Sequence, residues 1–357
     1  MEALPIFDHN DVHLEVSASK QTQTLLFFIS FIGMMLFFFI CSALIEKHKP
    51  SFGHETTYTI LLGIAFSVIL YYSTPNAPQT SNTFTFKPGF FFNFFLPPIV
   101  FNSGFNMRKK MFFKNLGNIA VFGLCVTLVC FVIYGLGGYL ATQIGLTSHD
   151  FRLDDMEAFG PAPFELSSIT TMQVLLYAAL LCSSDVVSAV SIVDYTEQPK
   201  LFSCIFGEGV ANDIVSIILF NTVEHLQSVE FVWYTPFVII AQFFMLGIVS
   251  LTIGLFFGFL TSFIFKHASF LRVNAITETF LMFSFSMISY FASSLIKISG
   301  IEMSGIISLL TCGIVQSHYT YYNLSPQGKT TSTLTVTFLG TAAEAGVYSY
   351  VGIALYS

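Results

Sequence analysis

Charged side chains are scarce in this chain, and their scarcity excludes most soluble proteins. Only 10% of the 357 residues are Asp, Glu, Lys or Arg, whereas soluble domains average about 25%. Hydrophobic residues make up 54%, with 43 phenylalanines against a single tryptophan, and the mean hydropathy is +0.72. The net charge of −7 argues against a nucleic-acid partner. We therefore expect an all-α protein that crosses a lipid bilayer repeatedly.

Cysteine is also too scattered to build a covalent framework. All six cysteines fall inside apolar segments, where they are expected to act as small buried hydrophobic residues. Neither a disulfide framework nor a structural metal site is predicted, and no cofactor is expected.

Ten apolar segments approach the length of about 20 residues that a bilayer-spanning helix needs. They lie at residues 24–45, 56–72, 88–105, 117–145, 167–193, 201–223, 234–265, 278–297, 300–318 and 331–356. Pro97 and Pro98 interrupt the third segment, and several others are too long or too broken for one straight helix. We expect a bundle of about ten spans with discontinuous helices, in which 1–23 is a lumenal or extracellular tail and 24–356 is the transmembrane domain.

The basic residues orient this bundle. With the N-terminus outside, ten Lys and Arg residues fall in cytosolic loops and four in outside segments, as the positive-inside rule requires. Ten spans then return the C-terminus to the outside. Glu278, Lys297 and Glu302 lie near span ends, where snorkelling or interfacial side chains are expected.

Acidic residues deep in the segment 201–223 point to chemistry. Glu208 and Asp213 have no basic residue nearer than Lys200, and one charge at the bilayer centre costs at least about 2.5–3.5 kcal/mol. Such carboxylates persist where they face a cavity, bind a cation or take up a proton. Asn212 lies four residues after Glu208 on the same helix face, so its amide can donate to that carboxylate.

A second buried acid, Asp185, lies near the centre of the segment 167–193, within the run SSDVVS at 183–188. Serine hydroxyls supply the oxygen ligands that hard cations such as sodium prefer. In membrane helices they also bond to their own backbone. For Ser183 and Ser188 both interpretations stay open.

Four stretches carry a resemblance to a known family. They read LPPIVFNSGF at 96–105, SSDVVSAV at 183–190, FGEGVANDIVSIILF at 206–220 and CGIVQSHYTYYNLS at 312–325. With these motifs in this order, the chain resembles sodium/proton exchangers of the monovalent cation/proton antiporter type, especially their organellar (endosomal) branch. The resemblance implies an inverted-repeat bundle that exchanges sodium or potassium for protons, as a homodimer, in an endosomal or other organellar membrane.

The resemblance also implies roles for single residues. Asp213 would bind the cation or the proton with Asn212 as its partner. Asp185, with Ser184, would help to hold the cation at an unwound helix crossing. Both aspartates would thus be transient ligands of a monovalent cation. The acids that would support the site, by an ion pair or by position, are Glu208 and Glu344.

The family pattern continues beyond the residues that match here. It has about three further spans, including an arginine expected to pair with the acid that matches Glu208. The chain ends at Ser357, so the resemblance implies a bundle without those last spans. It also has Val186 where the family has a proline after the aspartate.

Two other functions compete with transport. An intramembrane aspartyl protease also uses two acids on neighbouring helices, but Asp185 follows a serine and Asp213 follows an asparagine, so the Tyr-Asp and Gly-x-Gly-Asp pairs are missing. A non-transporting membrane subunit or relic would retain the same motifs. The buried carboxylates favour a secondary active transporter over an enzyme.

Overall fold

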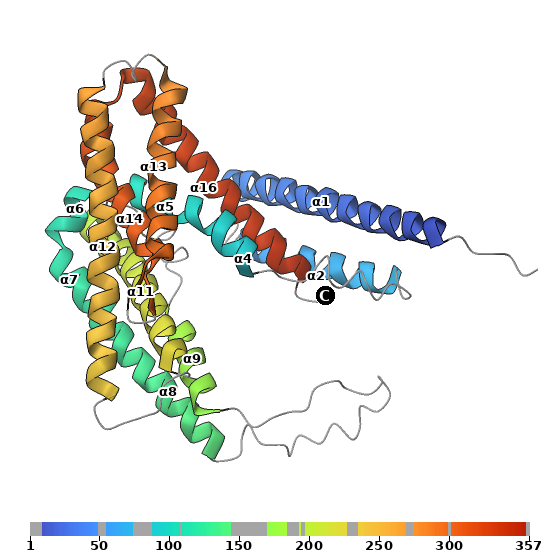
Figure 1. Ribbon diagram of the computed structural model, residues 1–357, viewed down its shortest axis with the longest axis horizontal. Helices are drawn as coiled ribbons and strands as arrows, with labels where there is room; N and C mark the ends of the chain where they lie inside the picture. The colour runs from blue at the N-terminus through green and yellow to red at the C-terminus, as the bar shows by residue number, and fades with distance from the viewer. Residues whose placement is uncertain are drawn as a thin grey trace, which may run out of the picture. The chain divides into compact units, whose positions relative to one another are not determined.

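A computed structural model describes residues 9–48, 55–73, 88–107, 109–143, 170–183, 193, 197–226, 235–268, 274–298 and 301–354. Nearly all of these residues are helical (Figure 1). The α-helices are α1 (His9–His48), α2 (Glu55–Ser73), α4 (Pro88–Phe90), α5 (Leu96–Asn106), α6 (Lys109–Lys114), α7 (Leu116–Ala120), α8 (Thr127–Gln143), α9 (Thr171–Leu181), α11 (Pro199–Leu226), α12 (Thr235–His267), α13 (Ala275–Leu295), α14 (Gly305–Val315), α15 (Tyr321–Asn323) and α16 (Pro326–Ala354). The π-helices are η1 (Phe91–Phe95), η2 (Val121–Val126) and η5 (Gln316–Thr320), and the strands are β1 (Lys297–Ile298) and β2 (Ile301–Glu302).

The described part of the chain contains five helical stretches that are long and apolar enough to cross a membrane. They are Phe28–Ile45, Leu116–Gln143, Pro199–Glu224, Ala241–His267 and Ala275–Leu295. Helices α2, α5, α9, α14 and α16 fall in the other five predicted segments. Every predicted segment therefore contains a helix, whereas a count of ten spans stays a prediction. The helix α1 begins within the segment predicted to be the N-terminal tail.

The third predicted segment is interrupted at its prolines, as expected. Pro97 and Pro98 have no N–H with which to close an α-helical turn. The turn before them is the π-helix η1, and the Leu96 N–H donates to the carbonyl of Phe91, five residues earlier. The interruption takes the form of a wider helical turn rather than a break in the helix.

The ninth predicted segment, 300–318, becomes helical later than expected. Strands β1 and β2 first form an antiparallel hairpin, in which Lys297 Nζ lies 2.7 Å from Glu302 Oε1 with both side chains exposed. The helix α14 begins at Gly305, after its N-cap residue Ser304. The exposed ion pair agrees with the interfacial position predicted for these two residues.

The chain divides into two compact units, residues 1–102 with 334–357 and residues 103–333. The first unit contains α1, α2, α4, η1, the part of α5 up to Asn102 and the part of α16 from Leu334. The second contains the helices from α6 to α15, with the hairpin and the start of α16. All three predicted site residues on α11 belong to the second unit.

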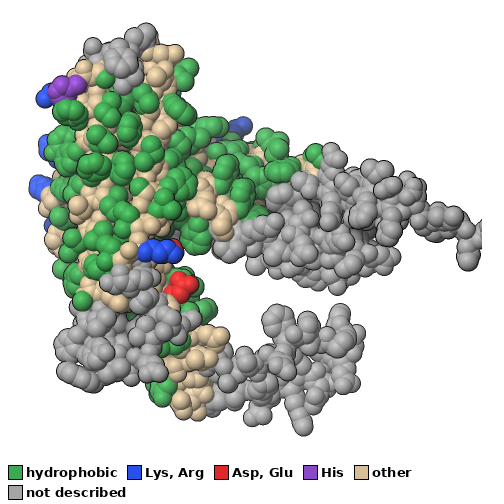
Figure 2. All heavy atoms as spheres, viewed as in Figure 1, with side chains coloured by type: hydrophobic (Ala, Val, Ile, Leu, Met, Phe, Trp, Pro, Cys, Tyr) green, Lys and Arg blue, Asp and Glu red, His purple; other side chains and the backbone are tan. Residues whose placement is uncertain are grey.

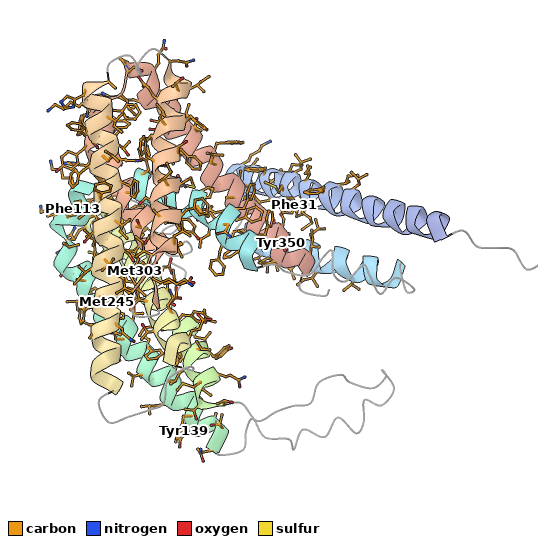
Figure 3. The ribbon with its side chains drawn as sticks, in the orientation of Figure 1. Phe31, Phe113, Tyr139, Met245, Met303 and Tyr350 are labelled. Atoms are coloured by element: carbon orange, nitrogen blue, oxygen red, sulfur yellow. The ribbon has the colours of Figure 1, made fainter. Side chains whose placement is uncertain are left out.

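Aromatic side chains form the core of the first unit. The buried Phe95 ring lies 6.0 Å from Phe31 and 6.4 Å from Tyr350, measured between ring centroids (Figure 3). Helices α2 and α16 cross at Gly63 and Gly352, where a Cβ on Gly63 would lie 2.7 Å from the Gly352 Cα. These two backbones touch because neither crossing residue has a side chain.

Helices α12, α13 and α14 form a closely packed group in the second unit. Leu246 of α12 is fully buried against Ile218 of α11, Met303 and Ile307. Met245 packs against this cluster, to which Met303 belongs (Figure 3). The apolar contacts join α11, which carries the predicted site, to α12 and α14.

A series of buried polar contacts, which we call the hydroxyl ladder, joins α13 to α14, η5 and α12. At its centre Gln316 is 0% exposed. Its Oε1 accepts from Ser286 Oγ at 2.9 Å, and its Nε2 donates to Thr261 Oγ1 at 3.1 Å. The other contacts are Ser289 Oγ with Ser308 Oγ at 2.7 Å, Ser293 Oγ with the Ser304 carbonyl at 3.1 Å, and Ser262 Oγ with Thr320 Oγ1 at 2.7 Å.

Apolar side chains cover the outside of the described helices. Figure 2 shows mainly hydrophobic side chains on the visible surface of the described residues, with few charged ones. Large exposed examples include Ile29, Val129, Ile248, Phe280 and Leu334. Contiguous apolar surface of this kind is typical of a face in contact with lipid.

Candidate functional site

The helix α11 carries the central predicted site residues, which are Glu208, Asn212 and Asp213. Glycines on α11 and on η2 let α11 and the neighbouring helices pack closely. The side chain of Ile119 on α7 occupies the space beside Gly207, and Gly123 of η2 lies directly against Ala211. A side chain at either glycine would collide with these neighbours. At Gly207 the approaching group is therefore a side chain rather than another backbone.

The Asp213 carboxylate meets the end of a neighbouring helix. The Ser183 hydroxyl donates a hydrogen bond to Asp213 Oδ1. Ser183 follows the last turn of α9, which ends at Leu181 with Cys182 as its C-cap. Asp213 itself is exposed. A carboxylate is therefore held by a hydroxyl at a helix end while one side stays accessible.

The neighbouring residue on α11 faces the interior. Asn212 is 1% exposed, and its Nδ2 donates to Glu208 Oε1 at 3.1 Å. The expected i, i+4 contact between the amide and the acid is confirmed. Asp213 lies about 100° further round the helix than Asn212. Glu208 is therefore paired with Asn212 within α11, whereas Asp213 points toward the end of α9.

Two further contacts fix the end of α9 against α11. Ser216 Oγ donates to the Ala179 carbonyl at 2.5 Å. Ala179 and Cys182 also form a buried apolar cluster with Val215 and Leu219 of α11. The position of Ser183 relative to Asp213 therefore rests on packing as well as on their own hydrogen bond.

The other predicted site residues are placed elsewhere or not described. Asp185 and Ser184 lie outside the described residues. Glu344 lies on α16 within the first compact unit and is partly buried. The structure thus brings together Glu208, Asn212 and Asp213 on one helix, and it leaves the contribution of the other three as a prediction.

Ser183 is the neighbour of Asp213 whose bonding the sequence left open. The resemblance assigned the adjacent Ser184 to the site, and the pattern alone did not separate cation contact from backbone bonding for Ser183. The position of Ser183 just after the end of α9 could have identified it, because a residue beyond the last helical turn is free to bond outside its own helix.

The chemistry available at Asp213 is simple. One carboxylate carries one negative charge, and the Ser183 hydroxyl adds a neutral oxygen beside it. Carboxylate and hydroxyl oxygens are the ligands that hard cations take. A carboxylate also accepts a single proton. The carboxylate can therefore hold either one monovalent cation or one proton, and the net charge of the occupied site is the same in both cases.

Known proteins with the same pattern are cation exchangers by name. The profile of the family described as "Sodium/hydrogen exchanger, transmembrane" matches residues 35–356. The chain is 30% identical over 319 residues to an uncharacterized Na(+)/H(+) antiporter of Schizosaccharomyces pombe, which covers 89% of this chain and 52% of that protein. It is 32% identical over 305 residues to the endosomal/prevacuolar sodium/hydrogen exchanger of Saccharomyces cerevisiae, which covers 85% of this chain and 44% of that protein.

A plant relative is also named as a sodium/hydrogen exchanger. The chain is 28% identical over 326 residues to sodium/hydrogen exchanger 1 of Oryza sativa subsp. japonica, covering 90% of this chain and 55% of that protein. The chain spans about half the length of the curated relatives it matches. The matched segment contains every predicted site residue, and the match leaves no support for the protease alternative. The chain belongs to the sodium/hydrogen exchanger family of membrane proteins.

Proposed function

We propose that this chain exchanges a monovalent cation for protons across a membrane. The observation that carries the proposal is the Asp213 carboxylate on an apolar span, bonded by Ser183 from a neighbouring helix end and adjacent to the Asn212–Glu208 pair. Family membership supports the same chemistry.

Competition for one carboxylate couples the two ions. If a proton and a cation occupied Asp213 together, their charges would repel by about 4 kcal/mol at about 4 Å and an effective dielectric constant of about 20. The carboxylate therefore binds one or the other. When the site opens alternately to the two sides of the membrane, this competition becomes an exchange.

Asp185 and Ser184 are proposed as further cation ligands. Both residues directly follow Ser183 in the sequence, and carboxylate and hydroxyl oxygens are ligands that hard cations take. Glu208 is proposed to support the site through its bond with Asn212, and Glu344 is proposed as a second supporting acid.

The ion and the membrane are proposed from the names of the relatives, and the assembly is proposed from the family resemblance. Sodium is proposed as the exchanged cation because the relatives are named as sodium/hydrogen exchangers, with potassium as the alternative. An endosomal or other organellar membrane is proposed because the Saccharomyces cerevisiae relative is named as endosomal/prevacuolar. A homodimer is proposed from the family resemblance.

Proteoliposome flux tests the proposal. The purified chain is reconstituted, a sodium or potassium gradient is applied, and lumenal pH is followed with a trapped dye. We expect cation-driven proton movement that Asp213→Asn and Asp213→Ala abolish and Glu302→Gln, an exposed acid on the hairpin, leaves unchanged. Equal flux in the Asp213 variants would remove this residue from the mechanism. An inactive but folded wild-type chain would favour the non-transporting alternative.

A further inference from the structure

One buried amide oxygen lies outside the proposed exchange site and is not hydrogen-bonded. Gln242 lies in the second turn of α12; its side chain is partly exposed, but its Oε1 atom is buried. Within the part of the chain that the structure describes, no donor reaches this oxygen. Buried polar groups are nearly always hydrogen-bonded, and an unsatisfied one destabilises the folded state. Stability therefore does not explain a glutamine at this position.

The buried acid Glu278 shows the usual arrangement. The sequence predicted an interfacial position for it, but it is 0% exposed in the first turn of α13. Ser325 donates to Glu278 Oε2 from its hydroxyl at 3.0 Å and from its backbone N–H at 3.2 Å. The interfacial prediction is wrong because these donors allow the carboxylate to be buried. Gln242 Oε1 has no comparable donor among the described residues.

Gln242 lies on the face of α12 that packs against the site helix α11. Leu246 and Val249 follow it by four and seven positions, so the three side chains share one helix face. Both belong to or pack against the apolar cluster that contains Ile218 of α11. A Cβ on Gly247 would lie 3.7 Å from Ile218 Cδ1, so α12 meets α11 at this level.

The connection between α11 and α12 fixes their relative direction. Residues 227–234 reach at most about 29 Å. The 28 residues of α11 form a helix about 42 Å long, so the connection cannot return along it. The two helices therefore run antiparallel. Because Ile218 is level with Gly247, Thr222 is level with the turn of α12 that contains Gln242.

Thr222 places a second buried oxygen at this level. It follows Ile218 by four positions and so shares its face. It is 1% exposed, and its hydroxyl donates to the Ile218 carbonyl at 2.7 Å. This bond turns the hydroxyl hydrogen toward its own helix and leaves the lone pairs of the oxygen as acceptors. Thr222 lies about 14 Å beyond Asp213 along the axis of α11, too far for both to hold one ion.

We propose that Gln242 Oε1 and the Thr222 hydroxyl form a transient binding site for the exchanged cation, between Asp213 and the side predicted to be outside. The inference rests on the proposed exchange. Amide and hydroxyl oxygens replace the waters that a cation loses when it enters an apolar bundle. Because neither group is charged, the cation is held weakly enough to pass on to the carboxylate.

Gln242→Leu tests this site because stability and transport should respond differently. Leucine introduces no buried acceptor, so thermal unfolding in sodium-free detergent should occur at the wild-type temperature or above it. In the proteoliposome assay, KM for sodium should rise about 2- to 10-fold, the range for one neutral oxygen partner. An unchanged KM, as expected if the amide only holds a water, would overturn the proposal. Unfolding at a lower temperature would also overturn it, since the amide would then have a structural partner.

Two matched controls make the comparison specific. Gln316→Leu removes an amide that is hydrogen-bonded at both ends in the hydroxyl ladder, so it should unfold earlier and keep the wild-type KM. Thr222→Val should raise KM as Gln242→Leu does. Thr252→Val should not, because it removes an exposed hydroxyl with the same kind of bond to its own helix. Equal KM values for the two threonine variants would contradict the assignment of Thr222.

The wild type and Asp213→Asn separate this inference from the exchange itself. Wild-type flux that Asp213→Asn abolishes, combined with an unchanged KM in Gln242→Leu, would remove the second site and leave exchange at Asp213 intact. Absence of cation-driven flux in the wild type would overturn the exchange and this inference with it.

Discussion

Ser183→Ala tests how strongly the Asp213 site depends on the hydroxyl beside it. The variant removes the donor to Asp213 Oδ1 and leaves α9 otherwise intact. A hydrogen bond to a charged group contributes about 1.5–3 kcal/mol, which corresponds to about 10- to 150-fold in an equilibrium constant. If the hydroxyl orients the carboxylate for the cation, KM for sodium should rise by a factor in this range, with a smaller change in kcat.

Two variants separate this effect from a loss of structure. Ser183→Thr retains a hydroxyl and should restore most of the cation affinity. Ser216→Ala removes a buried bond between the same two elements, α11 and α9, but does not touch the carboxylate. It should lower thermal stability and raise KM for sodium less than Ser183→Ala does, because the apolar cluster around Ala179 and Cys182 still holds the end of α9. Proteoliposome flux at a series of sodium concentrations gives KM, and a Ser183→Ala value within about twofold of the wild type would refute the reasoning.

Two further predictions concern packing. Gly63→Ala and Gly352→Ala should each destabilise the chain by about 1–3 kcal/mol, because the new methyl group enters a backbone contact. The control Gly137→Ala has open space around it and should be neutral or slightly stabilising. Equal melting temperatures of the three variants in detergent would contradict the contact between α2 and α16. Gln316→Leu should cost about 0.5–1.5 kcal/mol, since it removes one acceptor of the Ser286 hydroxyl, which keeps its bond to the Met282 carbonyl. Unfolding followed by the labelling of buried cysteines would show the loss, and an unchanged unfolding midpoint would argue against the contact.

Much of the fold could be predicted because bilayer spans have a strong local signature. The apolar runs fixed where helices lie, and α12 and α13 begin and end within a few residues of the predicted segments. The bond between Asn212 and Glu208 was also predictable, because residues four apart on a helix share a face. In both cases the determining interactions are local in sequence.

Contacts between distant residues could not be predicted in the same way. Glu278 reads as an interfacial acid until Ser325, 47 residues later, is placed beside it. Whether Ser183 bonds to its own helix or outside it depends on where α9 ends, and helix ends are weakly encoded in apolar sequence. The hairpin before α14 likewise depends on pairing rather than on hydropathy.

The hydroxyl ladder has a mechanical consequence. A shift of α13 along α14 by one helical turn, about 5.4 Å, would separate the Ser286–Gln316, Ser289–Ser308 and Ser293–Ser304 contacts in a single step. Each buried polar group left unsatisfied costs about 1–3 kcal/mol, so intermediate positions of such a slide are strongly disfavoured. We therefore expect α13 and α14 to move together in any conformational change, because sliding one along the other would break these contacts at once.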